Sequence, residues 1–342
     1  MQLSAVPTGQ QLARSRWGTH ESGAAFDQKK KPYLSEEARE FIEQQTICVV
    51  GGPGPNHTLS GLILPGAPGF VRPADAHTCL VPIEAALLDA QLLWRIERDQ
   101  AAGRQTQIAL FFLCHTTRRR LCVHGRAELC SPSPAYDRIY ICLHVTQSFF
   151  HCPRYIRTQI PGLTVGFGGR HWQADDLCTQ DSLSAPVRAF LEERVLCYLC
   201  TISHTGECGL NHRGGRPGFI VALPPDKRTP RGLILLPDYA GNGAFEAIGN
   251  ILETGRAALI VPSYADQLAL ILSGSARVIE PEHLLPDLQQ RCPGAQRVLA
   301  IGVERIEGQT GDWQGPLAHE RQRAALLRPQ LASTHSENTC PL

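Results

Sequence analysis

A short stretch in the second half of the chain combines a histidine, an arginine and two glycines. It reads LNHRGGRPGF and places Asn211, His212 and Arg213 directly before Gly214 and Gly215. The planar guanidinium of an arginine suits a phosphate or a carboxylate, and glycines let a ligand approach the backbone closely. Histidine titrates near neutrality, so His212 is the predicted acid–base residue. The equal alternative is that His212 has only a structural role in its strand.

A second stretch, AGNGAFEAIGNIL, places small residues directly before a predicted helix. The unpaired N–H groups and the dipole at the start of a helix both favour an anion. Gly241 and Gly243 leave room for it. The alternative is that Asn242 only caps the helix. Together the two stretches predict a site for an anionic ligand.

The chain repeats itself at an offset of 149 residues. LPGAPGF ends at Phe70 and RGGRPGF at Phe219, and FIEQQTIC and FLEERVLC begin at Phe41 and Phe190. LCVHGRAEL and LILSGSARV place Gly125 and Gly274 at the same offset, so three landmarks in one register predict an internal duplication. The first copy has the apolar LILPGAPGF where the second has LNHRGGRPGF, so the first copy is predicted to be scaffold and the second to bind the ligand.

Many short strands bounded by turn signals, with few helices, predict a mainly β (α+β) chain of two tandem β-barrels with helical insertions. We expect an N-terminal arm over 1–34 and a first barrel domain over 35–152. A connector over 153–183 then leads to a second barrel domain over 184–310 and a C-terminal tail over 311–342.

Composition narrows the function classes. The 342 residues carry 33 Lys and Arg against 32 Asp and Glu, a formal net charge of +1. This balance does not indicate a nucleic-acid or membrane partner. No apolar stretch has transmembrane length, and the N-terminus lacks the apolar core of a signal peptide. A cytoplasmic protein is the expectation.

The 13 cysteines do not predict a metal centre. Without a secretory signal they are expected to be reduced thiols. The cluster Cys197, Cys200, His204, Cys208 and His212 has zinc-ligand residue types. Strand alternation would point these side chains to different faces, so no metal site is predicted.

The order of several motifs resembles a known family. PGAPGFV, TTRRRLCVHGRAEL, FHCPRYI, NHRGGRPGF and PDYAGNGAFEAIGNIL follow one another as in tandem members of the pyridoxamine 5'-phosphate oxidase-like, FMN-binding split-barrel family. The resemblance runs from about Ser35 to Gly308. It implies two six-stranded split barrels with FMN at their interface. The matching positions are His212, Arg213, Gly214, Gly215, Asp238, Tyr239, Gly241, Asn242 and Asn250, with Asn211 where relatives usually have Ser.

The resemblance implies an FMN-dependent oxidoreductase that acts on an unidentified small molecule, and a homodimer is kept open. Ala240–Gly241–Asn242–Gly243 replaces the Ser-Arg-Lys cluster of the oxidases proper, so vitamin B6 oxidation is not predicted. Two alternatives stand beside this prediction. One is a flavin-independent biosynthetic enzyme on the same scaffold. The other is a non-catalytic protein that binds flavin or haem.

Overall fold

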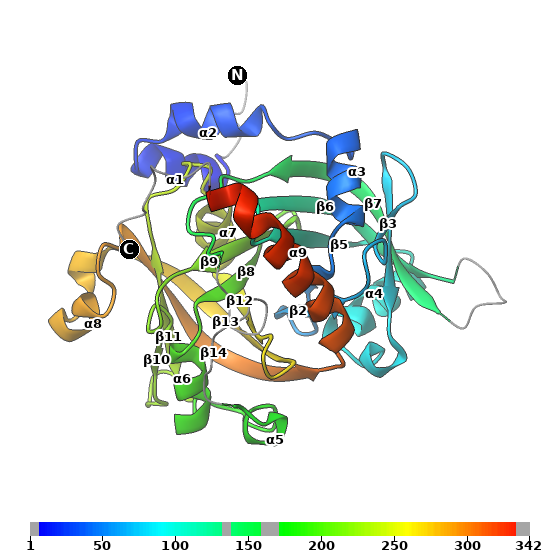
Figure 1. Cartoon of the computed structure of the whole chain (residues 1–342). Helices are drawn as coiled ribbons and strands as arrows, with labels where there is room; N and C mark the ends of the chain where they lie inside the picture. Colours follow the sequence, from blue (N-terminus) through cyan, green and yellow to red (C-terminus); the bar gives the residue numbers. More distant parts are fainter. Residues whose placement is uncertain (1–6, 132–137, 159–170, 333–342) are drawn as a thin grey trace.

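The first half of the chain forms one antiparallel sheet of seven strands. The structure is a computed structural model that describes residues 7–131, 138–158 and 171–332 (Figure 1). The strand order is β2-β1-β5-β6-β7-β4-β3. The elements are α3 (Glu36–Glu43), β1 (Ile47–Pro53), β2 (Leu59–Pro65), β3 (Arg72–Pro73), β4 (Thr78–Ile83), η1 (Ala85–Leu87), α4 (Gln91–Ala101), β5 (Thr106–Cys114), β6 (Arg119–Cys130) and β7 (Ile139–Phe150).

The second half repeats this architecture, in the strand order β9-β8-β12-β13-β14-β11-β10. Both long central ribbons have a bulge, at His124/Gly125 and at Ser273/Gly274, again 149 residues apart. The predicted fold class is confirmed, with a short seventh strand added to each sheet. The elements are α5 (Ala174–Leu177), α6 (Ala185–Glu192), β8 (Leu196–Ile202), β9 (Cys208–Gly214), β10 (Val221–Leu223), β11 (Leu233–Asp238), α7 (Glu246–Thr254), β12 (Arg256–Ser263), β13 (Leu268–Ile279), η2 (Pro281–His283), α8 (Pro286–Gln290) and β14 (Arg297–Thr310).

Each sheet has its own apolar core, and a third core joins the two copies. Neighbouring residues divide between them because alternate side chains on a strand point to opposite faces. Val50 lies in the first core and Val49 in the shared one. Leu259 lies in the second core and Ile260 in the shared one. The copies are so close that a Cβ on Gly61 would clash with the Ile260 side chain.

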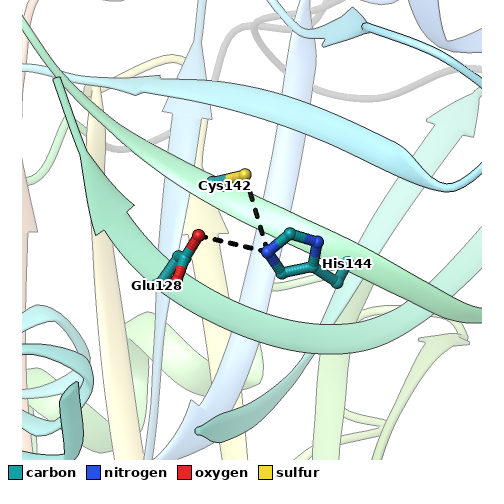
Figure 2. Close-up of side chains that lie close together, drawn as sticks. All are labelled: Glu128, Cys142 and His144. Carbon is teal, nitrogen blue, oxygen red and sulfur yellow. Dashed lines mark hydrogen bonds and ion pairs between the residues drawn. The ribbon is translucent and has the colours of Figure 1, made fainter. Parts of the chain in front are cut away.

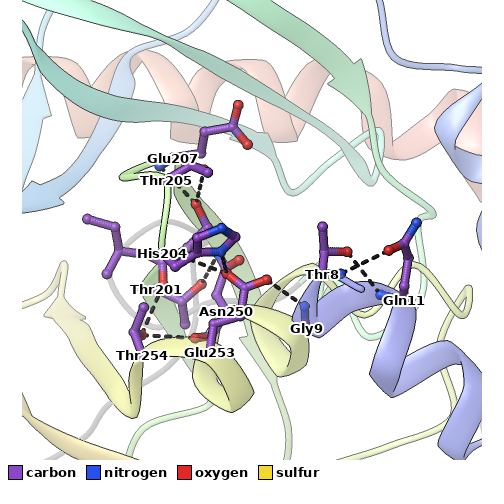
Figure 3. A network of polar contacts seen from close by, with 12 residues as sticks. Thr8, Gly9, Gln11, Thr201, His204, Thr205, Glu207, Asn250, Glu253 and Thr254 are labelled. Atoms are coloured by element: carbon purple, nitrogen blue, oxygen red, sulfur yellow. Dashed lines mark hydrogen bonds and ion pairs between the residues drawn. The ribbon is translucent and has the colours of Figure 1, made fainter. Parts of the chain in front are cut away.

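The N-terminal segment contains two helices, α1 (Gly9–Arg16) and α2 (His20–Asp27), that the sequence analysis did not foresee. Helix α1 packs on α7, and a Cβ on Gly9 would meet the Gly249 carbonyl. The Glu253 carboxylate accepts hydrogen bonds from the Gly9 N–H and from His204 (Figure 3). This network fixes α1 to the second copy at the C-terminal end of α7.

A long C-terminal helix, α9 (Gln314–Ala332), follows β14. Its first turns cover the seam between the copies, where Trp313 and Leu317 join the shared core. Trp313 packs against Tyr264 with ring centroids 6.1 Å apart. Neither α9 nor any other helix in the described ranges is long and apolar enough to span a membrane.

Candidate functional site

A cleft between the two copies collects polar residues from three parts of the chain. The first copy contributes Arg120 at the start of β6 and the segment 151–155 after β7. The second copy contributes the end of β9 and the stretch from the end of β11 to the first turn of α7. Phe26 of α2 closes one side, and the cavity measures about 120 Å³.

Strand alternation explains how Arg120 and His212 reach the cleft. On β6, Leu121 and Val123 fill the first barrel core, so Arg120 points toward the seam between the copies. On β9, Leu210 lies in the shared core and His212 is two residues further along the same face. Nη1 of Arg120 therefore lies 3.3 Å from Nδ1 of His212, each from a different copy.

Three buried nitrogen atoms at this cleft have no hydrogen-bond partner among the described residues. They are Nε of Arg120, Nε of Arg213 and Nε2 of His151. A buried polar atom without a partner costs about 1–3 kcal/mol, and native proteins rarely keep such atoms without a ligand or ordered water beside them. The cleft is therefore built to accept hydrogen-bond acceptors from outside the protein.

The histidines of the cleft are neutral at neutral pH. Burial, with the nearby charge of Arg120, holds the pKa values of His151 and His212 well below their usual range. Burial also lowers the pKa of Arg120 to about 10. Because the guanidinium of Arg120 can only donate, Nδ1 of His212 accepts and its ring proton lies on Nε2.

Two carboxylates offset part of the positive charge. Asp238 pairs with Arg213, with Nη1 and Oδ1 2.5 Å apart, and with Arg297, with Nη2 and Oδ2 2.7 Å apart. Glu246, in the first turn of α7, accepts a hydrogen bond of 2.9 Å from Asn211. The other two arginines of the cleft, Arg120 and Arg154, form no ion pair with a carboxylate among the described residues. The balance of charge in the cleft is therefore cationic.

The loop before α7 is held from outside by the N-terminal helices. The Arg14 guanidinium donates to the Ala244 carbonyl and pairs with Asp27 at 2.6 Å. Inside the loop, Asn242 accepts a hydrogen bond from the Ala244 N–H at 3.1 Å. Asn242 therefore stabilises the loop itself. The N–H groups of the first turn of α7 have no intrahelical hydrogen-bond partner, as at every helix start.

Two tyrosines stand at the mouth of the cleft. The rings of Tyr155 and Tyr239 are 5.6 Å apart, and the Tyr155 hydroxyl donates to the Ala240 carbonyl at 2.8 Å. The Tyr155 backbone approaches β9 so closely that a Cβ on Gly214 would lie 2.5 Å from the Tyr155 oxygen. Gly214 is therefore the residue that lets the two copies meet here.

Most of the residues predicted from the sequence lie together in this cleft. The lining includes Asn211, His212, Arg213, Gly214, Asp238, Tyr239, Gly241 and Asn242. Gly215 and Asn250 lie outside it. Gly215 belongs to the turn that packs on Phe219, and the Asn250 side chain donates to Thr201 at 3.1 Å.

The sequence predicted that the first copy completes the site but named no site residue from that copy or from the N-terminal arm. Arg120, His151 and Phe26 line the cleft but were not predicted as site residues. The available signal was the period of two along β6, which separates Arg120 from the core residue Leu121.

The equivalent position on the other side of the seam is filled by the protein itself. The Gln309 side chain donates to the Ile63 carbonyl at 2.6 Å and accepts from the Ile63 N–H at 2.9 Å. Ile63 is the counterpart of His212 at the offset of 149. Trp313 and Leu317 cover the same region. The duplicated architecture therefore has one open cleft and one filled counterpart.

The cysteine cluster with zinc-ligand residue types is divided between two cores. Cys197 lies in the second barrel core, while Cys200 and Cys208 lie in the shared core. All twelve cysteines in the described part of the chain are free thiols. Cys340, the thirteenth, lies outside the described residues.

No protein-family model matches the sequence, and no curated protein matches it. Solved structures similar to this chain include HupZ from Group A Streptococcus, with 16% identity and a TM-score of 0.28 over 36% of this chain and 92% of that one. A candidate pyridoxamine 5'-phosphate oxidase from Lactobacillus delbrueckii has 13% identity and a TM-score of 0.28 over 35% and 98%. HutZ, a haem storage protein from Vibrio cholerae, has 11% identity and a TM-score of 0.21 over 38% and 92%. These likenesses are too partial to assign an activity, which must come from the cleft itself.

Proposed function

We propose that the chain binds FMN in the cleft between its two copies and is an oxidoreductase acting on a small molecule there. The observation that carries the proposal is the set of three buried nitrogens without partners, Nε of Arg120, Nε of Arg213 and Nε2 of His151. They come from both copies and meet where the family resemblance expects the cofactor. A phosphate would supply the acceptors that they lack.

The residues of the cleft fit the anionic end of such a ligand. Arg213 presents its unpaired Nε while Asp238 holds its Nη1, so the guanidinium is positioned before any ligand arrives. The start of α7 adds backbone N–H groups and the positive end of a helix dipole. The Glu246 carboxylate is kept to one side by Asn211.

When bound, FMN would supply the redox chemistry, and the protein would bind, orient and exclude water. His212 is neutral and presents an N–H at Nε2, because Arg120 donates to its Nδ1. In this state it donates a hydrogen bond and does not act as an imidazolium acid. Tyr155 and Tyr239 provide aromatic surface at the mouth, as ligand pockets usually do.

The size of the cavity supports a second candidate function. About 120 Å³ is small beside the roughly 300–1,000 Å³ of typical ligand pockets. A flavin ring would need the loop before α7, or Phe26 on α2, to move outward. A flavin-independent enzyme acting on a smaller anionic substrate would need less movement, and the same three nitrogens would bind that substrate.

An absorption spectrum separates these functions. We would record it on freshly purified protein, then again after addition of FMN and removal of the excess by gel filtration. Flavin bands at close to one equivalent per chain support the proposal. A Soret band selects haem binding. A colourless protein that releases all FMN contradicts the proposal and leaves the flavin-independent enzyme.

A further inference from the structure

Three side chains of metal-ligating type meet on the ribbon formed by β6 and β7 (Figure 2). Nε2 of His144 lies 3.1 Å from Oε1 of Glu128 and 4.0 Å from Sγ of Cys142. All three ligand atoms lie within 4.8 Å of one another. Cys142 is buried, Glu128 is partly exposed and His144 is exposed, so an ion could enter from solvent.

The pairing of the strands creates this group. Glu128 lies directly opposite Cys142, and His144 follows Cys142 by two residues. Residues two apart share a face of a strand, so Cys130 on β6 also lies on this face, diagonal to Cys142. The Cys130 thiol interacts with the Cys142 thiol. Four potential ligands, two from each strand, therefore share one face of the ribbon.

We propose that Glu128, Cys142 and His144 bind a zinc ion, with Cys130 as the fourth ligand. Zinc prefers thiolate, imidazole and carboxylate ligands in tetrahedral arrangement. With metal–ligand bonds of 2.0–2.3 Å, the ligand atoms of such a site lie about 3.3–3.8 Å apart. The two observed separations, 3.1 and 4.0 Å, differ from that range by a few tenths of an ångström. Small rotations of exposed side chains would close the site.

The cluster is electrostatically suited to a cation. Burial, the neighbouring Cys130 and Glu128 together raise the pKa of Cys142 to about 11. Its thiol is therefore protonated at neutral pH in the absence of metal. Zinc binding would release that proton, because only the thiolate is a ligand.

The proposed zinc site is separate from the cleft. Arg120 and Glu128 lie eight residues apart on β6, which corresponds to roughly 26 Å along a strand. Strand β6 begins at the cleft and β7 ends there, and both strands carry the proposed zinc ligands at their other end. A structural ion there would fix the pairing of the ribbon that presents Arg120 and His151. The proposal does not depend on the proposed function of the cleft.

Metal titration tests the proposal. Full-length protein without an affinity tag, reduced and stripped of metal with a chelator, is titrated with Co²⁺ and then with Zn²⁺ in competition with a chelating dye. We expect one ion per chain, and visible Co²⁺ bands of a tetrahedral site with a thiolate charge-transfer band. Cys142→Ser should abolish the charge-transfer contribution of that thiolate and, like His144→Ala, weaken zinc binding more than about tenfold.

Matched controls distinguish this site from general thiol or imidazole binding. Cys178→Ser changes a partly buried free thiol outside the proposed site, and His57→Asn changes an exposed histidine in a conformation that asparagine tolerates. Both should keep the affinity of the unchanged protein. Circular dichroism of each metal-free variant checks that it is folded. The proposal is overturned if zinc does not bind, or if it binds equally well to the Cys142→Ser, His144→Ala and control proteins.

Discussion

Acid should destabilise this protein through its buried histidines, and His115 allows the effect to be calculated. His115 follows β5, is 4% exposed and donates from Nδ1 to the Arg157 carbonyl at 2.9 Å. Burial lowers its pKa from 6.5 to about 4. The perturbation is His115→Gln, which removes the titrating group.

The sign follows from the two pKa values of His115. The unfolded chain, with a pKa near 6.5, takes up a proton before the folded chain does. The stabilisation is therefore fully present above about pH 6.5 and is lost as the pH falls toward 4. Between pH 7 and pH 5, this linkage lowers the free energy of unfolding by about 1.8 kcal/mol through His115 alone.

Urea unfolding at pH 7 and pH 5 measures this loss. The unchanged protein should lose about 1.8 kcal/mol more unfolding free energy between the two pH values than His115→Gln does. His57→Asn, a change at an exposed histidine, should keep the full pH dependence. If His115→Gln and the unchanged protein respond equally to acid, His115 is not a buried neutral histidine in the folded protein.

Two further predictions concern the surroundings of the cleft. Gly214→Ala places a Cβ 2.5 Å from the Tyr155 carbonyl oxygen and should lower the unfolding free energy by about 1–3 kcal/mol in the urea assay. Gly241→Ala is the control: the nearest neighbour of its Cβ is 3.9 Å away, so the unfolding free energy should change little. Arg14→Ala removes the buried cation that holds the loop before α7 and should cost about 2–3 kcal/mol and speed proteolysis of the N-terminal segment. Arg16→Ala, which breaks a more exposed pair, should cost less than about 1 kcal/mol, and equal protease sensitivity of the two variants would contradict the role given to Arg14.

The duplication and the strands could be predicted because they depend on local sequence. The offset of 149 residues links PGF at Phe70 to PGF at Phe219, and the same turn geometry follows at both places. Gly69 and Gly218 both have positive φ. The N–H of each donates a hydrogen bond to the end of the helix that precedes the first strand of its copy. Turn chemistry and strand alternation are properties of a few adjacent residues, so they could be read without knowledge of the fold.

The site was predicted only for the copy that carries its unusual residues. His212 and Arg213 stand out because the first copy is apolar at the same positions. Arg120 is the last of three consecutive arginines, and only the register of β6 shows that it enters the seam. The filled counterpart depends on Gln309 reaching Ile63, a contact between residues 246 positions apart. Such contacts depend on how the copies pack, which no local pattern contains.

The affinity for FMN of two arginine variants tests the central claim most directly. Arg213→Gln removes a cleft guanidinium, while Arg216→Gln changes an exposed arginine three residues later. A charge-assisted hydrogen bond contributes about 1.5–3 kcal/mol, so Arg213→Gln should weaken FMN binding by about 10-fold to 100-fold. Arg216→Gln should leave it within about twofold. Equal affinities for the two variants, or no FMN binding by the unchanged protein, would contradict the claim that this cleft binds the anionic cofactor.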